Sequence, residues 1–307
     1  MRKIILSSVF VATIGLAAAS VCFAGAVLPA DDDEELVPTG KGWGERVPPG
    51  LAKQPPPNAK PQGSNGIVYH GGPVILGTTN AYYIWYGNWG ANTAKTILTD
   101  LAGSIGGSPY YNINTTYYDG SNTHVSNSVH YAGSTTDGGS TALSDSGVQA
   151  VVASAITSGR LPKDTNAVYF VLTSAEVNET SGFCTQYCGW HTHGTIAGSD
   201  IKYSFVGNPD RCPSACAAQT IGPNDNAGAD GMASIIAHEL EEAVSDPDLN
   251  AWYDRRGYEN ADKCAWTFGS LSTASNGSKY NMTLGARNYL IQQNWVNAGG
   301  GYCAKSY

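Results

Sequence analysis

The chain has 307 residues, enough for one large domain or two ordinary ones, and only 14% of them are charged. Its formal net charge of −8 argues against nucleic acids and anionic membrane surfaces as partners, because both repel an acidic protein. Beyond the first 26 residues no apolar run reaches the length of a membrane span, so we expect no membrane insertion.

The N-terminus has the features of a secretory signal peptide. Basic Arg2 and Lys3 precede an apolar run over residues 4–21, and Ala-Gly-Ala at residues 24–26 fits a cleavage site of small residues. We therefore expect residues 1–26 to be removed and the mature protein to be secreted, either extracellular or periplasmic.

The next segment, residues 27–66, is acidic at its start and then rich in proline and glycine. Such a composition cannot bury enough apolar surface to fold by itself. The segment is either a disordered linker or a pro-segment, and the sequence favours neither. We expect one folded domain over residues 67–307, acting as a monomer.

Apolar patterns predict alternating strands and helices in the first half of this domain. The aromatic-rich run at residues 80–89 could form a sugar-stacking surface, but a core strand is favoured because aromatic side chains suit pleated, half-buried surfaces. In chain order we then expect a helix over residues 92–104, strands over 115–118 and 125–131 with Gly120 between them, and a helix over 141–157.

The second half of the domain supplies the centre of the predicted sheet. Residues 167–174 form a near-continuous apolar run, which is typical of a buried central strand. A shorter strand is predicted at residues 202–206, and a helix capped by Asp230 and ended before Pro247 follows. This order predicts an α/β (α+β) fold, a three-layer-like domain with a mixed, mostly central sheet. Its architecture is similar to that of zincin metallopeptidases.

The stretch AHELEEAVSDP at residues 237–247 carries the strongest chemical signal. His238 and Glu242 lie one helical turn, about 6 Å, apart on one face. That is the spacing with which the H-E-x-x-H motif holds zinc, here with a carboxylate in the second position. Burying these charges in an otherwise apolar helix is costly unless they are paired or bind a metal. Glu239 would then act as a general base on a metal-bound water.

A catalytic zinc needs a third protein ligand. We choose Glu259, which follows the helix in a loop that can fold back, with Asp262 and Asp246 as alternatives. The competing interpretation is that these are ordinary turn residues, since aspartate favours turns. His191 and His193 would share one face of a strand and could complete the site, hold a second ion or stabilise an oxyanion.

Six cysteines remain after the predicted signal peptide, and an even count in an exported chain predicts three disulfides. Fifteen pairings are possible, and sequence alone does not choose among them. A four-cysteine zinc site is the competing hypothesis. We expect two local pairs and one distant pair: Cys184–Cys188, Cys212–Cys216 and Cys264–Cys303.

Several long stretches resemble the EXORDIUM, or phosphate-induced, family of secreted proteins. They are YHGGPVILGTTNAYYIWYGNW, LPKDTNAVYFVLTSAEV, GFCTQYCGWH, SFVGNP, and CPSAC with GPNDNAGADGM. The resemblance implies a shared fold, an extracellular, cell-wall-associated context and a growth-related role without an established enzymatic activity. We expect plant members to carry an uncharged helix in place of residues 237–247, so this chain would represent a branch with a zincin-like HExxE helix.

Taken together, the sequence predicts a secreted zinc-dependent hydrolase, acting as a peptidase on a peptide or protein substrate or on a cell-wall component. Zinc would lower the pKa of its bound water and polarise a carbonyl. Calcium is the alternative ion, and it would make the helix a structural clamp. The rival function is a non-catalytic extracellular protein with a structural metal or none. No G-x-S-x-G elbow supports a serine hydrolase.

Overall fold

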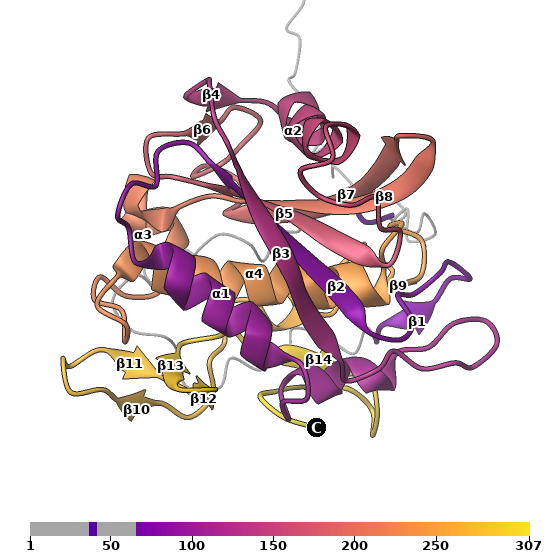
Figure 1. Ribbon diagram of the computed structural model, residues 1–307. Helices are drawn as coiled ribbons and strands as arrows, with labels where there is room; N and C mark the ends of the chain where they lie inside the picture. The colour runs from indigo at the N-terminus through magenta and orange to yellow at the C-terminus, as the bar shows by residue number, and fades with distance from the viewer. Residues whose placement is uncertain (1–36, 42–65) are drawn as a thin grey trace, which may run out of the picture. The chain divides into compact units, whose positions relative to one another are not determined.

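Figure 1 shows the computed structural model, which describes residues 37–41 and 66–307. The predicted signal peptide and most of the predicted linker lie outside the described residues. None of the helices in the described part of the chain is long and apolar enough to cross a membrane.

A five-stranded mixed sheet in the order β3-β2-β5-β8-β7 forms the centre of the domain. The first four strands run parallel, and β7 closes one edge antiparallel to β8. Every residue of β5 is buried, as its continuous apolar sequence predicts for a central strand. The strands are β2 (Thr79–Tyr86), β3 (Val129–Asp137), β5 (Ala167–Thr173), β7 (Gly189–Ile196) and β8 (Ser199–Val206).

Helices cover both faces of this sheet (Figure 1). Helices α1 (Ala94–Ile105) and α4 (Ala227–Ser245) pack against each other on one face, and α2 (Asp145–Thr157) packs against β5 and β8 on the other. The expected α/β class with a central mixed sheet is therefore confirmed. The strands predicted around residues 80–89, 167–174 and 202–206 and both early helices are present.

Shorter elements complete the domain, and most of those after residue 250 lie below α1 and α4 in Figure 1. The short helices are η1 (Tyr111–Thr116), η2 (Pro209–Arg211), α3 (Pro213–Cys216) and η3 (Asp262–Cys264). Small antiparallel pairs join β1 (Val68–Tyr69) to β9 (Trp252–Tyr253), β10 (Ser272–Thr273) to β11 (Lys279–Tyr280), β12 (Met282–Leu284) to β13 (Arg287–Tyr289), and β14 (Asn294–Val296) to β15 (Tyr302–Ala304). A parallel pair joins β4 (Ala142–Leu143) to β6 (Asn178–Glu179).

Of the two strands predicted here, the one at residues 125–131 is correct only from Val129 onward, and the one at residues 115–118 is wrong. Its first half ends the 3₁₀ helix η1, and the two segments meet only through an isolated bridge between Tyr118 and His124. The real strand, β3, starts later, at Val129, and pairs in parallel with β2 after the crossover through α1. The local alternation of apolar and polar residues predicts extended structure near β3, but it does not identify the partner strand β2, which lies about 50 residues away in sequence.

Helix α4 is buried along almost its entire length between the sheet and the C-terminal segments. It begins earlier than predicted, because Asn226 rather than Asp230 is the N-cap and accepts a hydrogen bond from the Ala229 amide. Asp230 accepts instead from the backbone and side chain of Asn224. The helix ends at Ser245, as predicted from Pro247.

The disulfides contradict the predicted local pairing. The structure contains three disulfides, as expected, and the pair Cys264–Cys303 is confirmed. The two C-x₃-C segments instead lie side by side and are linked to each other, Cys184 to Cys212 and Cys188 to Cys216. The cysteines of α3 lie one turn apart, so both face the same neighbouring segment. The four-cysteine zinc site is excluded, because all four sulfurs are bonded in pairs.

Candidate metal centre

A cluster of histidines and carboxylates lies inside the protein where the second half of α4 faces β7. Residues His238, Glu239 and Glu242 come from α4, and His191 comes from β7. All four side chains are at most 1% exposed. The segment after β9 adds Glu259 at 2% exposure and Asp262 at 9%. The sequence analysis named all six residues, but only the fold brings them into one cluster.

Gly189 allows α4 to approach β7 closely enough for this contact. A Cβ atom at this position would lie 2.5 Å from the side chain of Ile235 and 3.0 Å from Glu239 Oε1. His191 is two residues further along the strand, so its side chain projects from the same face as Gly189. The glycine is therefore part of the site, and the sequence analysis missed it.

The first group of candidate ligands surrounds Nδ1 of His191. This nitrogen lies 3.5 Å from Glu239 Oε2 and 3.5 Å from Glu242 Oε2. The three atoms are mutually close enough to hold a metal ion. His191 thus stands beside the HExxE helix, whereas the sequence left its role open.

The second group surrounds Nε2 of His238. This nitrogen lies 3.0 Å from Glu242 Oε1 and 3.7 Å from Asp262 Oδ1, and these atoms too are close enough to hold one ion. The Asp262 amide donates to Glu242 Oε1 over 3.0 Å, which fixes the loop against the helix. Glu242 is the residue that both groups share.

The remaining predicted ligands occupy different positions. Glu259 Oε1 lies 3.4 Å from Nε2 of His191, on the opposite side of the imidazole from the first group. Asp246 Oδ1 accepts two backbone hydrogen bonds of 2.6 Å, from the amides of Asn250 and Ala251, and so holds the turn that follows α4. Glu259 therefore lies behind His191, and Asp246 shapes the adjacent turn.

The loop that carries Glu259 and Asp262 is positioned by Asn260, which is completely buried. Its amide group donates to Ser245 Oγ over 2.9 Å and to the Glu241 carbonyl oxygen over 3.0 Å, at the end of α4. The sequence analysis did not single out Asn260. Asn260 directly follows Glu259, and no local sequence pattern distinguishes it from an ordinary loop residue.

His193 belongs to a separate, partly exposed group. Its Nδ1 lies 2.8 Å from Asp200 Oδ1 and 3.7 Å from Asp248 Oδ1. The ammonium of Lys202 contacts both of these aspartates, at 3.1 Å from Asp248. This lysine already offsets part of their negative charge, so the group has less need of a cation than the buried cluster.

The buried cluster contains many polar atoms without partners. Both ring nitrogens of His191 and of His238, and both carboxylate oxygens of Glu239, have no hydrogen-bond partner among the described residues. Buried polar groups are normally hydrogen-bonded, and buried charges are normally paired or bound to a metal. A bound cation would satisfy these atoms together.

Burial and mutual contacts shift the pKa values of the cluster strongly. Burial raises the pKa of Glu239 to about 7. Burial acts on Glu242 in the same direction, but the imidazoles of His238 and His191 outweigh it and lower the pKa of Glu242 to about 2. Burial lowers the pKa of each histidine, but nearby carboxylates, chiefly Glu259 for His191 and Glu242 for His238, raise it well above the usual range. Without a cation, the cluster must take up protons on its imidazoles, its carboxylates or both to limit the buried charge.

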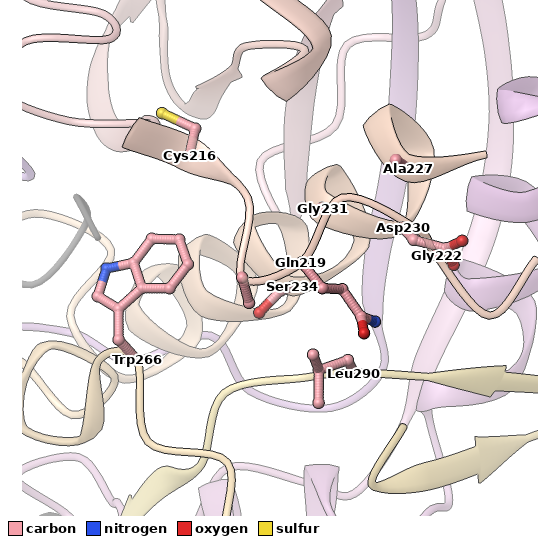
Figure 2. A pocket seen from close by; sticks show the side chains of 10 residues that line it. Cys216, Gln219, Gly222, Ala227, Asp230, Gly231, Ser234, Trp266 and Leu290 are labelled. Atoms are coloured by element: carbon pink, nitrogen blue, oxygen red, sulfur yellow. The ribbon is translucent and has the colours of Figure 1, made fainter. Parts of the chain in front are cut away.

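A small pocket lies at the other half of α4 (Figure 2). Asp230 and Ser234 of α4 line it opposite Trp266 and Leu290, and no residue of the buried cluster does. Ser234 Oγ accepts a hydrogen bond from the Gln292 amide over 3.1 Å. Because Ser234 and Asp230 both have partners within the protein, this pocket offers few free polar groups for a ligand.

Comparison with known proteins agrees with the resemblance seen in the sequence. A family model described as phosphate-induced protein 1 conserved region matches residues 67–304. EXORDIUM-like 5 of Arabidopsis thaliana is 32% identical over 281 aligned positions, which cover 76% of this chain and 77% of that protein. EXORDIUM-like 3 of the same plant is 31% identical, with 76% and 82% covered. PHOSPHATE-INDUCED 1 of Nicotiana tabacum is 26% identical, with 61% and 67% covered.

No solved structure matches the chain, so the likeness to zincin metallopeptidases stays a prediction. The family model spans the five-stranded sheet, α4 and all three disulfides. The chain therefore belongs to the phosphate-induced protein 1 family, together with the EXORDIUM-like plant proteins.

Proposed function

We propose that this protein is a secreted, non-catalytic member of its family in which a buried metal centre stabilises the fold. One observation carries the proposal: the histidines and carboxylates of the HExxE helix and of β7 converge at no more than 1% exposure, and most of their polar atoms have no hydrogen-bond partner among the described residues. A cation bound there would join α4, β7 and the loop that carries Asp262. Secretion is supported by the predicted signal peptide and the three disulfides.

Zinc is the ion that we propose. Imidazole nitrogen is a good ligand for zinc, whereas calcium prefers six to eight oxygen ligands. His191 and His238 each direct an unpartnered nitrogen toward carboxylate oxygens, so the donor set is mixed. Such a set favours zinc over calcium.

Two observations favour a structural over a catalytic metal. The cluster is buried, and a catalytic zinc needs an open coordination position that substrate or water can reach. The relatives are named EXORDIUM-like or PHOSPHATE-INDUCED, and none of these names denotes an enzyme. We propose that the protein's partner is a component of the cell wall or of a host surface. We also propose that the chain represents a branch of the family that keeps the acidic helix.

A secreted zinc peptidase is the second candidate, and Glu239 is the observation that favours it. Its pKa of about 7, raised by burial, contrasts with the lowered pKa of Glu242, and such a separation is typical of acid–base pairs in enzymes. In that function Glu239 would take a proton from a zinc-bound water.

Metal analysis combined with a peptide-cleavage assay distinguishes the two candidates. The purified parent protein is expected to contain zinc, His238→Ala is expected to bind less of it, and Glu242→Ala is expected to lose it. We expect the parent to cleave a broad peptide library no faster than Glu239→Gln does. If the parent cleaves peptides and Glu239→Gln lowers the rate by roughly 10²–10⁴-fold, the usual scale for loss of a general base, the peptidase function replaces ours.

Glu241→Gln is the matched control for these variants. Glu241 is a buried carboxylate of the same helix, but it lies near Asn114 Nδ2, at 3.4 Å, and outside both groups of candidate ligands. This variant should retain zinc at the parent level. A parent protein without any transition metal would refute the structural-metal proposal.

A further inference from the structure

We propose that the buried cluster binds two divalent cations, bridged by the carboxylate of Glu242. The first ion would be held by His191, Glu239 and Glu242, and the second by His238, Glu242 and Asp262. The inference rests on the metal binding proposed above and adds the number of ions and the bridging residue.

The two oxygens of Glu242 point to different imidazoles. Oε2 lies 3.5 Å from His191 Nδ1, and Oε1 lies 3.0 Å from His238 Nε2. Each oxygen of this buried carboxylate therefore faces a different potential metal ligand. This arrangement is that of a carboxylate bridge, with one oxygen for each ion.

The distances within each group fit coordination by a small divalent ion. Ligand atoms about 2.0–2.1 Å from a tetrahedral zinc lie about 3.3–3.4 Å from one another. Around His191 the two measured separations are both 3.5 Å, and around His238 they are 3.0 and 3.7 Å. Each group can therefore hold an ion with small side-chain movements.

Neighbouring groups also orient the proposed ligands. Glu259 Oε1 lies 3.4 Å from His191 Nε2. It can accept a hydrogen bond from the N–H at that nitrogen, which leaves Nδ1 free for an ion. Metal-bound histidines usually make such a contact through their second nitrogen. The Asp262 amide, which donates to Glu242 Oε1, fixes the bridge in a similar way.

Charge balance favours two ions over one. Glu239, Glu242, Asp262 and Glu259 contribute four negative charges when ionised, and two divalent cations balance them. With a single ion, two buried negative charges would remain or would require protons, and an unbalanced buried charge is costly. Two ions remove that requirement without protonated histidines.

The first test is metal stoichiometry in the parent protein. The purified secreted chain is loaded with zinc, dialysed and analysed for metal per polypeptide, and two ions per chain are expected. In a second sample loaded with Mn²⁺, electron paramagnetic resonance should show an exchange-coupled pair. Neither measurement needs a variant, so both stand even if a substitution prevents folding.

Variants then assign the ligands. His191→Ala and His238→Ala should each retain one ion, whereas Glu242→Ala should lose both, and Glu241→Gln should retain both. One ion per parent chain refutes the two-ion inference but leaves the proposed metal centre intact. No bound ion refutes both. Two magnetically uncoupled Mn²⁺ ions, or a Glu242→Ala protein that keeps two ions, refutes the bridge.

Discussion

At the scale of single residues, the site depends on one position without a side chain. Gly189 lies on β7 where α4 crosses it, and a Cβ there would approach Ile235 Cγ2 to 2.5 Å and the Phe205 carbonyl oxygen to 2.9 Å. Both Ile235 and Phe205 are completely buried in the core. The closeness of α4 and β7, and with it the 3.5 Å separation between His191 and the helix carboxylates, therefore requires glycine.

We expect Gly189→Ala to destabilise the protein by about 1–3 kcal/mol, the usual range for overpacking a core. It should also weaken zinc binding, because moving α4 away separates His191 from Glu239. Denaturant unfolding and zinc titration measure the two effects. Gly194→Ala is the control on the same strand, since the one close contact of its Cβ would be the end of the Gln149 side chain, at 2.7 Å, which can move. Equal effects of the two substitutions would contradict this account.

At the scale of elements, β7 is an edge strand that is partly covered by residues 37–41. The carbonyl oxygen of Gly40 accepts a hydrogen bond of 3.1 Å from the His191 amide. Lys41 Nζ lies 2.6 Å from Asp145 Oδ2 and 2.9 Å from Ser181 Oγ. This part of the predicted linker thus pairs with the strand that carries a candidate ligand, and an edge that is covered in this way is protected from pairing with other chains.

We expect deletion of residues 27–65 to leave a folded domain that is slightly less stable than the full chain. The lost backbone hydrogen bond to His191 contributes about 1 kcal/mol, and the partly exposed Lys41 ion pair contributes at most about as much. For a domain of this size, each kcal/mol lowers Tm by roughly 2–4 °C. Deletion of residues 27–36 alone should leave Tm unchanged in thermal melts. Coincident melts of the two deletions would show that residues 37–41 contribute nothing.

At the scale of the whole molecule, the sequence predicted what depends on local pattern. The buried strand β5 follows from a continuous apolar run, the end of α4 from Pro247, and the HExxE face from helical spacing. Strand partners, disulfide partners and the approach of His191 to the helix depend on contacts between distant segments. Cys184 and Cys212, for example, are 28 residues apart, and no local rule distinguishes that pair from Cys184–Cys188.

The proposed metal centre joins α4, β7 and the Asp262 loop, so its removal should affect those elements before the rest of the fold. A ligand that binds only the folded state stabilises it by RT ln(1 + [L]/Kd), about 2.7 kcal/mol at a hundredfold excess over Kd. We expect chelation to lower Tm and to speed amide hydrogen exchange in β7 and the second half of α4. The amides of β5, at the centre of the sheet, should stay protected. Restoring zinc to the chelated protein should restore both Tm and protection, whereas calcium should not. A chelated, metal-free protein with unchanged Tm and exchange would show that protons, and not a metal, compensate the charge of the buried carboxylates.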